Sequence, residues 1–214
     1  MELFSDAGAI DRYLEEHSQK EDPVLSELAR QTYLKEVHPR MLSGHILGSF
    51  LSMFSKMLMP ERILEIGTYT GYSAICLARG LKAGGRLTTI EVNDELRSTA
   101  LSYFRKANLL EKIELINGDA LKVLPDLKDS YDLVFMDANK DDYISYYDQV
   151  IDKVKGGGYI LVDNVLWGGK VLDPKSDDQT TKIIDKFNKL ITADLRVENL
   201  LLPVRDGIMV IKKK

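Results

Sequence analysis

Along the first 58 residues, apolar side chains recur at steps of three and four, which is the spacing of a helix that buries one face. Pro23, Pro39 and Pro60 interrupt this pattern. It predicts an N-terminal helical segment over residues 1–58, with its helices inside 5–58. The apolar positions are Ile10, Tyr13, Leu14, Leu25, Leu28, Ala29, Ile46, Leu47, Phe50, Leu51, Phe54 and Leu58.

From residue 59 onward, short apolar runs typical of buried strands alternate with segments of helical spacing. Such alternation predicts a parallel sheet with helices on both faces. The glycines at 156–158 are expected to end a helix. Strands are expected at 62–66, 86–91, 113–117, 133–136 and 159–162, and helices at 73–79, 94–107, 120–124, 141–154 and 177–191.

The apolar runs 197–202 and 208–212 flank a turn sequence at 203–207 and predict a β-hairpin. This hairpin makes the sheet mixed. For the 214 residues we expect one α/β domain, with the sheet in the core 59–214. The expected architecture is a doubly wound, seven-stranded mixed sheet with an antiparallel C-terminal hairpin strand, preceded by the N-terminal helices.

Residues 63–73, with the sequence ILEIGTYTGYS, join an apolar strand to the start of a helix through Gly67 and Gly71. Backbone N–H groups and the positive end of the helix dipole at such a turn bind an anionic group of a cofactor. Dinucleotide-binding turns carry G-x-G-x-x-G, whereas this turn carries G-x-x-x-G. The difference favours S-adenosylmethionine (SAM), which has no pyrophosphate. A dehydrogenase and an ordinary strand-to-helix turn are the alternatives.

Acidic residues end all five expected parallel strands. The carboxyl ends of parallel strands share one edge, where open α/β sheets bind ligands, so this pattern predicts a functional edge. Glu91 suits the ribose hydroxyls of an adenosine. Asp119 and Ala120 lie where adenine is expected, although Asp119 also suits a helix N-cap. The acidic residues are Glu65, Glu91, Asp119, Asp137 and Asp163.

Asp137, Asp163 and Asn164 place oxygen ligands at the ends of two strands that are expected to be neighbours. Two carboxylates and an amide carbonyl suit a hard divalent cation, Mg²⁺ first, with Mn²⁺ or Ca²⁺ as alternatives. Either aspartate alone is more typical of a helix cap. Together the three residues favour a metal site.

Lys140 follows Asp137 by three residues, which predicts a position beside the same metal. A neighbouring cation lowers the pKa of a lysine, and a neutral amine can accept a proton from a hydroxyl. The position therefore predicts a general base. The alternative is a solvated lysine paired with Asp141 or Asp142.

The formal net charge is −4, and the basic residues are scattered apart from three lysines at 212–214. A nucleic-acid partner would require a basic stripe, so we expect a small-molecule substrate and no nucleic acid. No segment is apolar over the length of a membrane span, so no membrane partner is expected. The N-terminal residues lack the features of a secretory signal, which predicts a cytoplasmic location.

These residues together resemble the cation-dependent class I O-methyltransferases of the caffeoyl-coenzyme A and catechol O-methyltransferase group. The resemblance covers nearly the whole chain and is strongest at residues 64–73 and at 163–167, DNVLW. It implies a Rossmann-like methyltransferase fold, SAM as methyl donor, a divalent cation, a phenolic small-molecule acceptor and a homodimer.

The resemblance also implies roles for individual residues. The metal ligands would be Asp137, Asp163 and Asn164, the catalytic base Lys140, and Trp167 would lie near the acceptor. The implied reaction is direct methyl transfer to one hydroxyl of a catechol-like phenol. The implied SAM-binding residues are Ser43, Glu65, Gly67, Thr68, Ser73, Glu91, Ala120 and Asp137.

Two departures from the family pattern concern the acceptor. Gly168 and Gly169 stand where plant caffeoyl-coenzyme A enzymes carry an asparagine after the tryptophan, and the N-terminal helices show no basic cluster for a coenzyme A phosphate. A free catechol, a hydroxycinnamate or a flavonoid-like phenol is therefore favoured over a coenzyme A thioester. An acceptor group in RNA or protein is a further alternative, and the acidic net charge argues against RNA.

Overall fold

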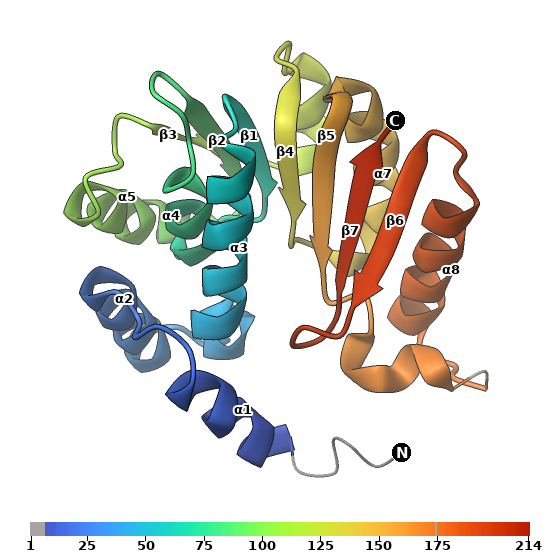
Figure 1. Cartoon of the computed structure of the whole chain (residues 1–214), viewed down its shortest axis with the longest axis horizontal. Coiled ribbons are helices and arrows are strands. Elements are labelled where there is room, and N and C mark those ends of the chain that lie inside the picture. The colour runs from blue at the N-terminus through green and yellow to red at the C-terminus, as the bar shows by residue number, and fades with distance from the viewer. Residues whose placement is uncertain (1–6, 174) are drawn as a thin grey trace.

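A computed structural model describes residues 7–173 and 175–214 and builds them around one seven-stranded sheet (Figure 1). The strand order is β3-β2-β1-β4-β5-β7-β6. It reverses between β1 and β4, the place where open α/β sheets bind ligands. The strands are β1 (Arg62–Ile66), β2 (Arg86–Glu91), β3 (Ile113–Asn117), β4 (Tyr131–Met136), β5 (Val154–Asp163), β6 (Val197–Leu202) and β7 (Ile208–Lys213).

Helices cover both faces of this sheet (Figure 1). Helices α2 to α5 pack on one face and α6 to α8 on the other, each over its own apolar cluster. Successive side chains of a strand point to opposite faces, so Ile63 joins the first cluster and Leu64 the second. The helices are α1 (Ala7–Glu16), α2 (Pro23–Lys35), α3 (Gly44–Leu58), α4 (Tyr72–Ala78), α5 (Arg97–Lys106), α6 (Ala120–Val123), α7 (Tyr143–Val150) and α8 (Gln179–Ala193).

Short 3₁₀ helices connect several of these elements. Two of them extend α5 and α7 at their N-terminal ends, and two others lie beside the cavity described below. They are η1 (Pro39–Met41), η2 (Asp94–Leu96), η3 (Leu124–Asp126), η4 (Lys140–Asp142), η5 (Ile151–Lys153) and η6 (Trp167–Leu172).

The predicted fold class is confirmed. Strands β1 to β5 pair in parallel, whereas β7 is antiparallel to both β5 and β6. The N-terminal segment forms α1, α2, η1 and α3, as the apolar spacing predicts. The part of the helical prediction that falls on residues 5 and 6 lies outside the described residues.

The prediction for residues 141–158 is wrong in part. Helix α7 ends at Val150, and the three glycines 156–158 lie inside β5 rather than at the end of a helix. Tyr131 pairs with Val154 and Leu133 with Tyr159, so two steps along β4 correspond to five along β5. The glycines accommodate this bulge, because Gly157 adopts a φ of +78° that other residues rarely adopt.

The antiparallel direction of β7 brings the hairpin turn to the carboxyl ends of the parallel strands. Ile208, the first residue of β7, pairs with Asp163, the last residue of β5. Residues 203–207 therefore lie at the edge where the sequence predicts ligand binding. This position makes the turn part of the site described below.

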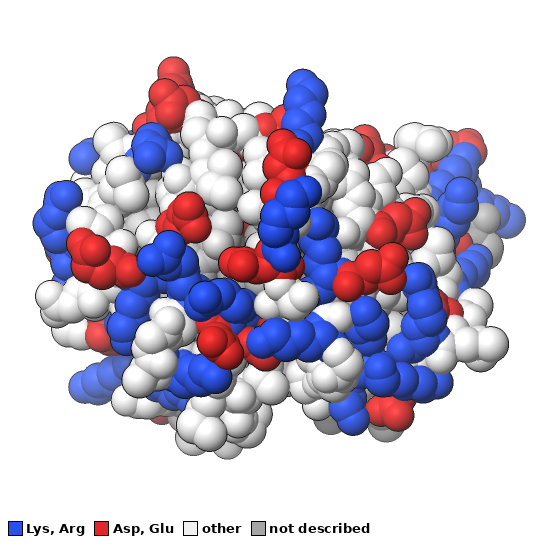
Figure 2. All heavy atoms as spheres, turned by 90° about the horizontal axis from the view of Figure 1, so that it is seen from above, with Lys and Arg blue, Asp and Glu red and all other residues white. Residues whose placement is uncertain are grey.

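Charges of both signs are interspersed on the face seen from above in Figure 2. Ion pairs at the protein surface include Lys82 with Glu61 and Lys155 with Asp132. Within residues 7–173 and 175–214, no helix combines the length and apolar character needed to cross a bilayer.

Candidate active site

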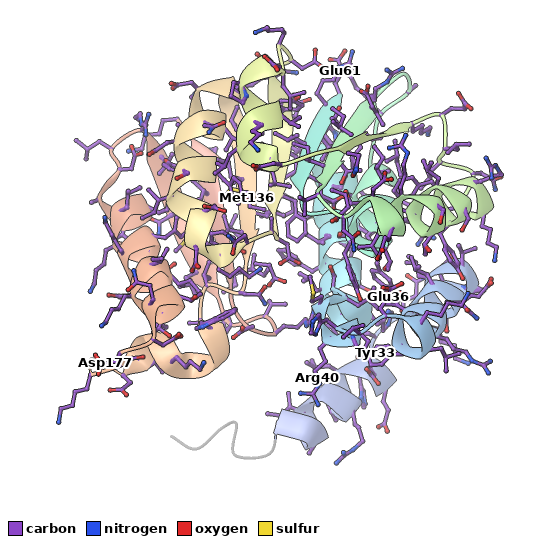
Figure 3. The ribbon with its side chains drawn as sticks, turned by 180° about the vertical axis from the view of Figure 1, so that it is seen from behind. Tyr33, Glu36, Arg40, Glu61, Met136 and Asp177 are labelled. Atoms are coloured by element: carbon purple, nitrogen blue, oxygen red, sulfur yellow. The ribbon has the colours of Figure 1, made fainter. Side chains whose placement is uncertain are left out.

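The loops that follow the parallel strands surround one cavity of about 1400 Å³. A second wall comes from residues 36–43, which connect α2 to α3. In Figure 3, Glu36 and Arg40 from this connection lie toward the opposite end of the molecule from Glu61, which precedes β1. The cavity therefore lies at the carboxyl edge of the sheet.

Seven of the eight residues predicted to bind SAM line this cavity. The eighth, Glu65, is fully buried and is not part of the lining. The structure thus brings together residues from four strand ends and from the start of α3, and their role in binding stays a prediction. The seven are Ser43, Gly67, Thr68, Ser73, Glu91, Ala120 and Asp137.

The turn between β1 and α4 requires glycine at two positions. Gly67 has a φ of +99°, and a Cβ atom there would lie 2.1 Å from the carbonyl oxygen of Asp137. Gly71 has a φ of +92°, and a Cβ atom there would lie 2.6 Å from the ring of Phe104. The G-x-x-x-G spacing thus reflects the close approach of β1 to β4 and of α4 to α5.

Glu91, at the end of β2, is held at the cavity wall by backbone donors. The N–H group of Tyr69 donates to Oε2 at 2.7 Å, and that of Asn93 donates to Oε1 at 2.9 Å. A carboxylate oxygen can accept more than one hydrogen bond. Glu91 can therefore also accept hydrogen bonds from two adjacent hydroxyls of a ligand.

Glu65 occupies the interior behind this wall. Thr89 donates its hydroxyl to Oε2 at 2.5 Å, whereas Oε1 is buried without a hydrogen-bond partner among the described residues. Burial raises the pKa of Glu65 to about 8, while the hydroxyls of Ser73 and Thr89 act in the opposite direction. The carboxyl group is therefore mostly protonated at pH 7.

The helix cap expected at Asp119 is confirmed, and its place near adenine stays a prediction. Its Oδ1 accepts a hydrogen bond from the N–H group of Leu121 at 3.0 Å and caps α6. Asp119 and Ala120 also line the cavity. The helix cap thus holds both residues at the cavity wall.

Lys140 lies in the cavity beside Asp137, with Nζ 2.7 Å from Oδ1. Asp141 and Asp142, the partners proposed in the alternative, accept hydrogen bonds from Thr180 and Asn139 instead. Burial acts to lower the pKa of Lys140, but Tyr143 and the Asp137 carboxylate outweigh it and raise this pKa. Lys140 is therefore a protonated ion-pair partner in this structure.

Asp163 and Asn164 line the same cavity as Asp137. The N–H group of Asn164 donates to Asp163 Oδ1 at 2.8 Å, and the Tyr143 hydroxyl donates to the Asp163 carbonyl at 2.9 Å. Burial raises the pKa of Asp163 to about 7, and the nearby Asp137 carboxylate contributes in the same direction. Asp137 and Asp163 are thus close enough to repel each other.

This donor set fits a hard divalent cation. Two carboxylates that repel each other gain from a cation between them, and the side chain of Asn164 supplies a third oxygen. The part of the chain that the structure describes contains no group of three His, Cys, Asp or Glu side chains arranged to hold a metal. The set therefore depends on an amide ligand together with oxygens from water or substrate.

Trp167 lines the cavity after β5. Its indole N–H donates to Asp178 Oδ2 at 3.2 Å, and Lys170 Nζ lies 5.8 Å from the centre of its ring system. The sequence did not predict the 3₁₀ helix that begins here. Gly168 and Gly169, with φ values of +62° and +77°, allow the kink within it.

Sequence reasoning missed two contributions to the cavity. Residues 36–42 carry no apolar periodicity, yet His38, Arg40 and Met41 line the cavity, and the Tyr69 hydroxyl donates to the His38 carbonyl at 3.2 Å. Arg205, in the hairpin turn, also lines it. The antiparallel hairpin was the available signal for Arg205, because it directs the turn to this edge.

Comparison with known proteins agrees with the resemblance. A family model described as O-methyltransferase matches residues 15–214. A caffeoyl-CoA O-methyltransferase from Stellaria longipes is 34% identical over 202 residues, which cover 88% of this chain and 83% of the relative. Caffeoyl-CoA O-methyltransferase 2 from Petunia hybrida is 38% identical over 179 residues, which cover 78% and 74%.

Solved structures show the same architecture. The O-methyltransferase from Bacillus cereus, solved in complex with SAH, superposes with a TM-score of 0.89 at 31% identity and covers 96% of this chain and 97% of its own. The O-methyltransferase TomG from Streptomyces achromogenes, involved in tomaymycin synthesis and solved with SAM, gives 0.89 at 31% identity over 96% of each chain. This chain therefore belongs to the O-methyltransferase family.

Proposed function

We propose that this enzyme transfers the methyl group of SAM to one hydroxyl of a catechol-like phenol, with the help of a divalent cation. The observation that carries the proposal is that the Asp137–Lys140 pair, Asp163 and Asn164 share one cavity with the glycine turn. The complexes of the Bacillus cereus and Streptomyces achromogenes enzymes with SAH and SAM support the choice of methyl donor.

The SAM site would use the wall formed by β1 and β2. Gly67 lets the turn pack against the Asp137 carbonyl and itself lines the cavity, so the backbone of the turn can contact a ligand. Glu91 would accept the two ribose hydroxyls, because its carboxylate is fixed by two backbone N–H groups. Ser43, Thr68, Ser73 and Ala120 complete this wall.

Asp137, Asp163 and Asn164 would hold the cation. When bound, a divalent cation lowers the pKa of an acceptor hydroxyl and helps to orient it. Asp163 has a pKa of about 7, so its carboxyl group has to lose a proton before it can act as a ligand. Metal affinity should therefore increase as pH rises through 7.

Lys140 would accept the proton of the acceptor hydroxyl at Nζ. It can do so only when the Asp137 carboxylate is engaged elsewhere, because the ion pair keeps the amine protonated. The acceptor oxygen then attacks the methyl carbon in line, the carbon–sulfur bond breaks, and the sulfonium becomes the thioether of SAH. Orientation of the two reactants is the main contribution of the cavity.

The acceptor could be a free catechol or a coenzyme A thioester, since the relatives in the comparison are named for caffeoyl-CoA. Coenzyme A carries several phosphate charges, which favour a basic lining. Among the described lining residues, seven carboxylates face three basic side chains, which supports an uncharged catechol. The carboxylates are Glu36, Glu91, Glu95, Asp119, Asp137, Asp142 and Asp163, and the basic residues are Arg40, Lys140 and Arg205.

A methyl-transfer assay tests this proposal. The purified enzyme is incubated with SAM and with catechols, monohydroxy phenols and caffeoyl-CoA, each with Mg²⁺ and with a chelator. We expect methylation of catechols that requires metal. Equal methylation of monohydroxy phenols in chelator would contradict the proposal, and a strong preference for caffeoyl-CoA would replace the catechol by the thioester.

The variant Asp163→Asn tests the metal ligand. We expect kcat/KM for a catechol to drop at least about 100-fold, because removal of one anionic ligand weakens cation binding, while the Kd for SAH stays within about twofold. Calorimetry measures SAH binding. The control is Asp129→Asn, which removes an aspartate that is 57% exposed and pairs with Arg62 at the surface.

We further propose that the enzyme is a homodimer. Two methionines one helical turn apart on α3, Met53 and Met57, are 64% and 73% exposed, and Met59 just after the helix is 65% exposed. Exposed apolar side chains that lie together mark surfaces that associate. The cytoplasmic location expected from the sequence stays a prediction.

A further inference from the structure

The turn at 203–207 makes hydrogen bonds to both walls of the cavity. Some of these bonds connect the turn to the residues just before α3, more than 160 positions away in the chain. The others connect it to the loop that follows β5. The turn itself is fixed between β6 and β7 at the carboxyl edge of the sheet. It therefore connects the start of α3 to the loop that follows β5.

Arg205 makes the first connection. Its Nη1 donates to the carbonyl of Leu42 at 3.1 Å and also to the carbonyl of Ser43. Within the described residues no carboxylate forms an ion pair with Arg205, and its hydrogen bonds go to backbone carbonyls. Its charge also acts on Asp163, where it works to lower the pKa of that carboxyl group against the effect of burial. Guanidinium groups suit this task, because their several donors are held in one plane.

Peptide planarity transmits the effect of these bonds. In a trans peptide the N–H group points opposite to the C=O group of the same unit. Because Arg205 holds the carbonyls of Leu42 and Ser43, the N–H groups of Ser43 and Gly44 point away from Arg205. Gly44 begins α3, and the first N–H groups of a helix have no partner within it. Arg205 thus sets the direction of the N–H groups of Ser43 and Gly44. These groups lie where the 36–43 connection ends, and this part of the cavity lining is called here the Ser43 wall.

Asp206 and Gly207 make the second connection. The N–H group of Gly168 donates to Asp206 Oδ1 at 2.5 Å, and that of Leu166 donates to the Asp206 carbonyl at 2.9 Å. The N–H group of Val165 donates to the Gly207 carbonyl at 3.2 Å. These bonds hold the residues on either side of Trp167, which lines the cavity. This part of the lining is called here the Trp167 wall. The contact is tight, since a Cβ atom on Gly207 would lie 2.5 Å from Leu166 Cγ.

We propose that Arg205 and Asp206 are positioning residues that control the two walls separately: Arg205 sets affinity for SAM through the Ser43 wall, and Asp206 sets affinity for the acceptor through the Trp167 wall. The inference rests on the proposed function, because it assigns Ser43 to the cofactor and Trp167 to the acceptor. Neither side chain takes part in the chemical step.

The first variant is Arg205→Ala. We expect the Kd for SAH, measured by calorimetry, to rise about tenfold, while the KM for a catechol at saturating SAM and saturating Mg²⁺ changes by less than about twofold. Arg205→Lys should recover part of the affinity, because one ammonium can still reach a carbonyl. The control is Arg196→Ala, which removes an arginine paired with Asp194 at 2.6 Å and absent from the cavity lining.

The second variant is Asp206→Ala, for which the opposite split is expected. The KM for the catechol should rise about tenfold, while the Kd for SAH stays within about twofold. Asp206→Asn should restore the KM, because an amide oxygen can accept the same hydrogen bond from Gly168. A general loss of stability would move both constants together and would not be restored in this way.

The outcomes separate this inference from the proposed function. If the wild-type enzyme does not bind SAH, the proposed function fails. If it binds SAH but both variants alter the two constants equally, or alter neither, the separate control of the walls is overturned. Thermal melting checks that each variant is folded. Should Arg205→Ala not fold, Arg205→Gln takes its place, and an unchanged Kd for SAH in that variant overturns the role of Arg205.

Discussion

Glu65 illustrates how burial decides the charge of a single residue beside the cavity. Its side chain has no exposed surface, and one of its oxygens lacks a hydrogen-bond partner among the described residues. Desolvation disfavours the ionised form, which accounts for the raised pKa. The sequence pattern predicts that Glu65 lies at a strand end, but it does not show that its carboxyl group is buried behind the cavity wall.

A pH dependence of stability follows from this raised pKa. Below pH 4.5 Glu65 is protonated in both the folded and the unfolded chain, whereas above about 8 it is ionised in both. The folded state therefore loses stability as pH rises from 4.5 to 8, by an amount on the order of a few kcal/mol. Asp163, with a raised pKa of about 7, contributes in the same direction.

Glu65→Gln tests this expectation in the ligand-free enzyme. The variant should show a weaker decrease of Tm between pH 5 and pH 8 than the wild type, because the amide does not ionise. Thermal melts over this range supply the measurement. Glu114→Gln, at an exposed position on β3, is the matched control and should follow the wild-type curve. A Glu65→Gln curve parallel to the wild type would contradict the assignment.

At the scale of single elements, the turn between β1 and α4 shows how one missing side chain permits a strand contact. Gly67 and Gly84 both have φ values in the left-handed region, +99° and +76°, but only Gly67 is crowded. A Cβ atom at Gly84 meets nothing within 4 Å. Alanine variants at these two glycines therefore distinguish two effects on stability. Gly84 reports backbone strain alone, whereas Gly67 reports backbone strain together with a collision.

We expect Gly84→Ala to lower the free energy of unfolding by about 1–2 kcal/mol, the cost of a left-handed conformation in a residue with a Cβ atom. Gly67→Ala should cost more, because it adds a collision with the Asp137 carbonyl, and it should also weaken SAH binding at least about tenfold. Urea unfolding and calorimetry provide the two measurements. Equal losses of stability in the two variants would show that the collision is relieved at little cost.

Element types were easier to predict than the irregular parts. Buried strands give short apolar runs and helices give a spacing of three to four, and both signals are local. The glycines 156–158 were predicted wrongly, because a glycine triplet suits a helix end and a strand bulge equally well. Only the pairing of β5 with β4 decides between the two. The kink at Gly168 and Gly169 likewise depends on contacts with the distant turn at 203–207.

At the scale of the whole molecule, the exposed methionines on α3 provide a test of the proposed homodimer. Met53→Lys and Met57→Lys together should convert a dimer to a monomer, because two charges would be buried against the partner. Light scattering after size exclusion measures the mass. The control is Leu195→Lys, at a position that is 89% exposed near α8. A wild-type enzyme that elutes as a monomer would refute the homodimer directly.

The assembly of the cavity also shows where prediction from sequence stops. The acidic strand ends could be placed on one edge from the alternating pattern alone, because parallel strands share their direction. The wall from residues 36–43 could not, since its position depends on Arg205 and on the Tyr69 hydroxyl, which lie far from it in the chain. Such contacts leave no periodic signal.

The antiparallel insertion of β7 has a consequence for biosynthesis. Among the described lining residues, Arg205 is the last in chain order, and the strand that fixes its turn is made later still. Domains acquire structure progressively as the ribosome delivers them. A nascent chain that already holds all five parallel strands would therefore still lack the hydrogen bonds from Arg205 to Leu42 and Ser43. If Arg205 sets SAM affinity as proposed, tight binding of SAM during translation is expected only after β7 has left the exit tunnel.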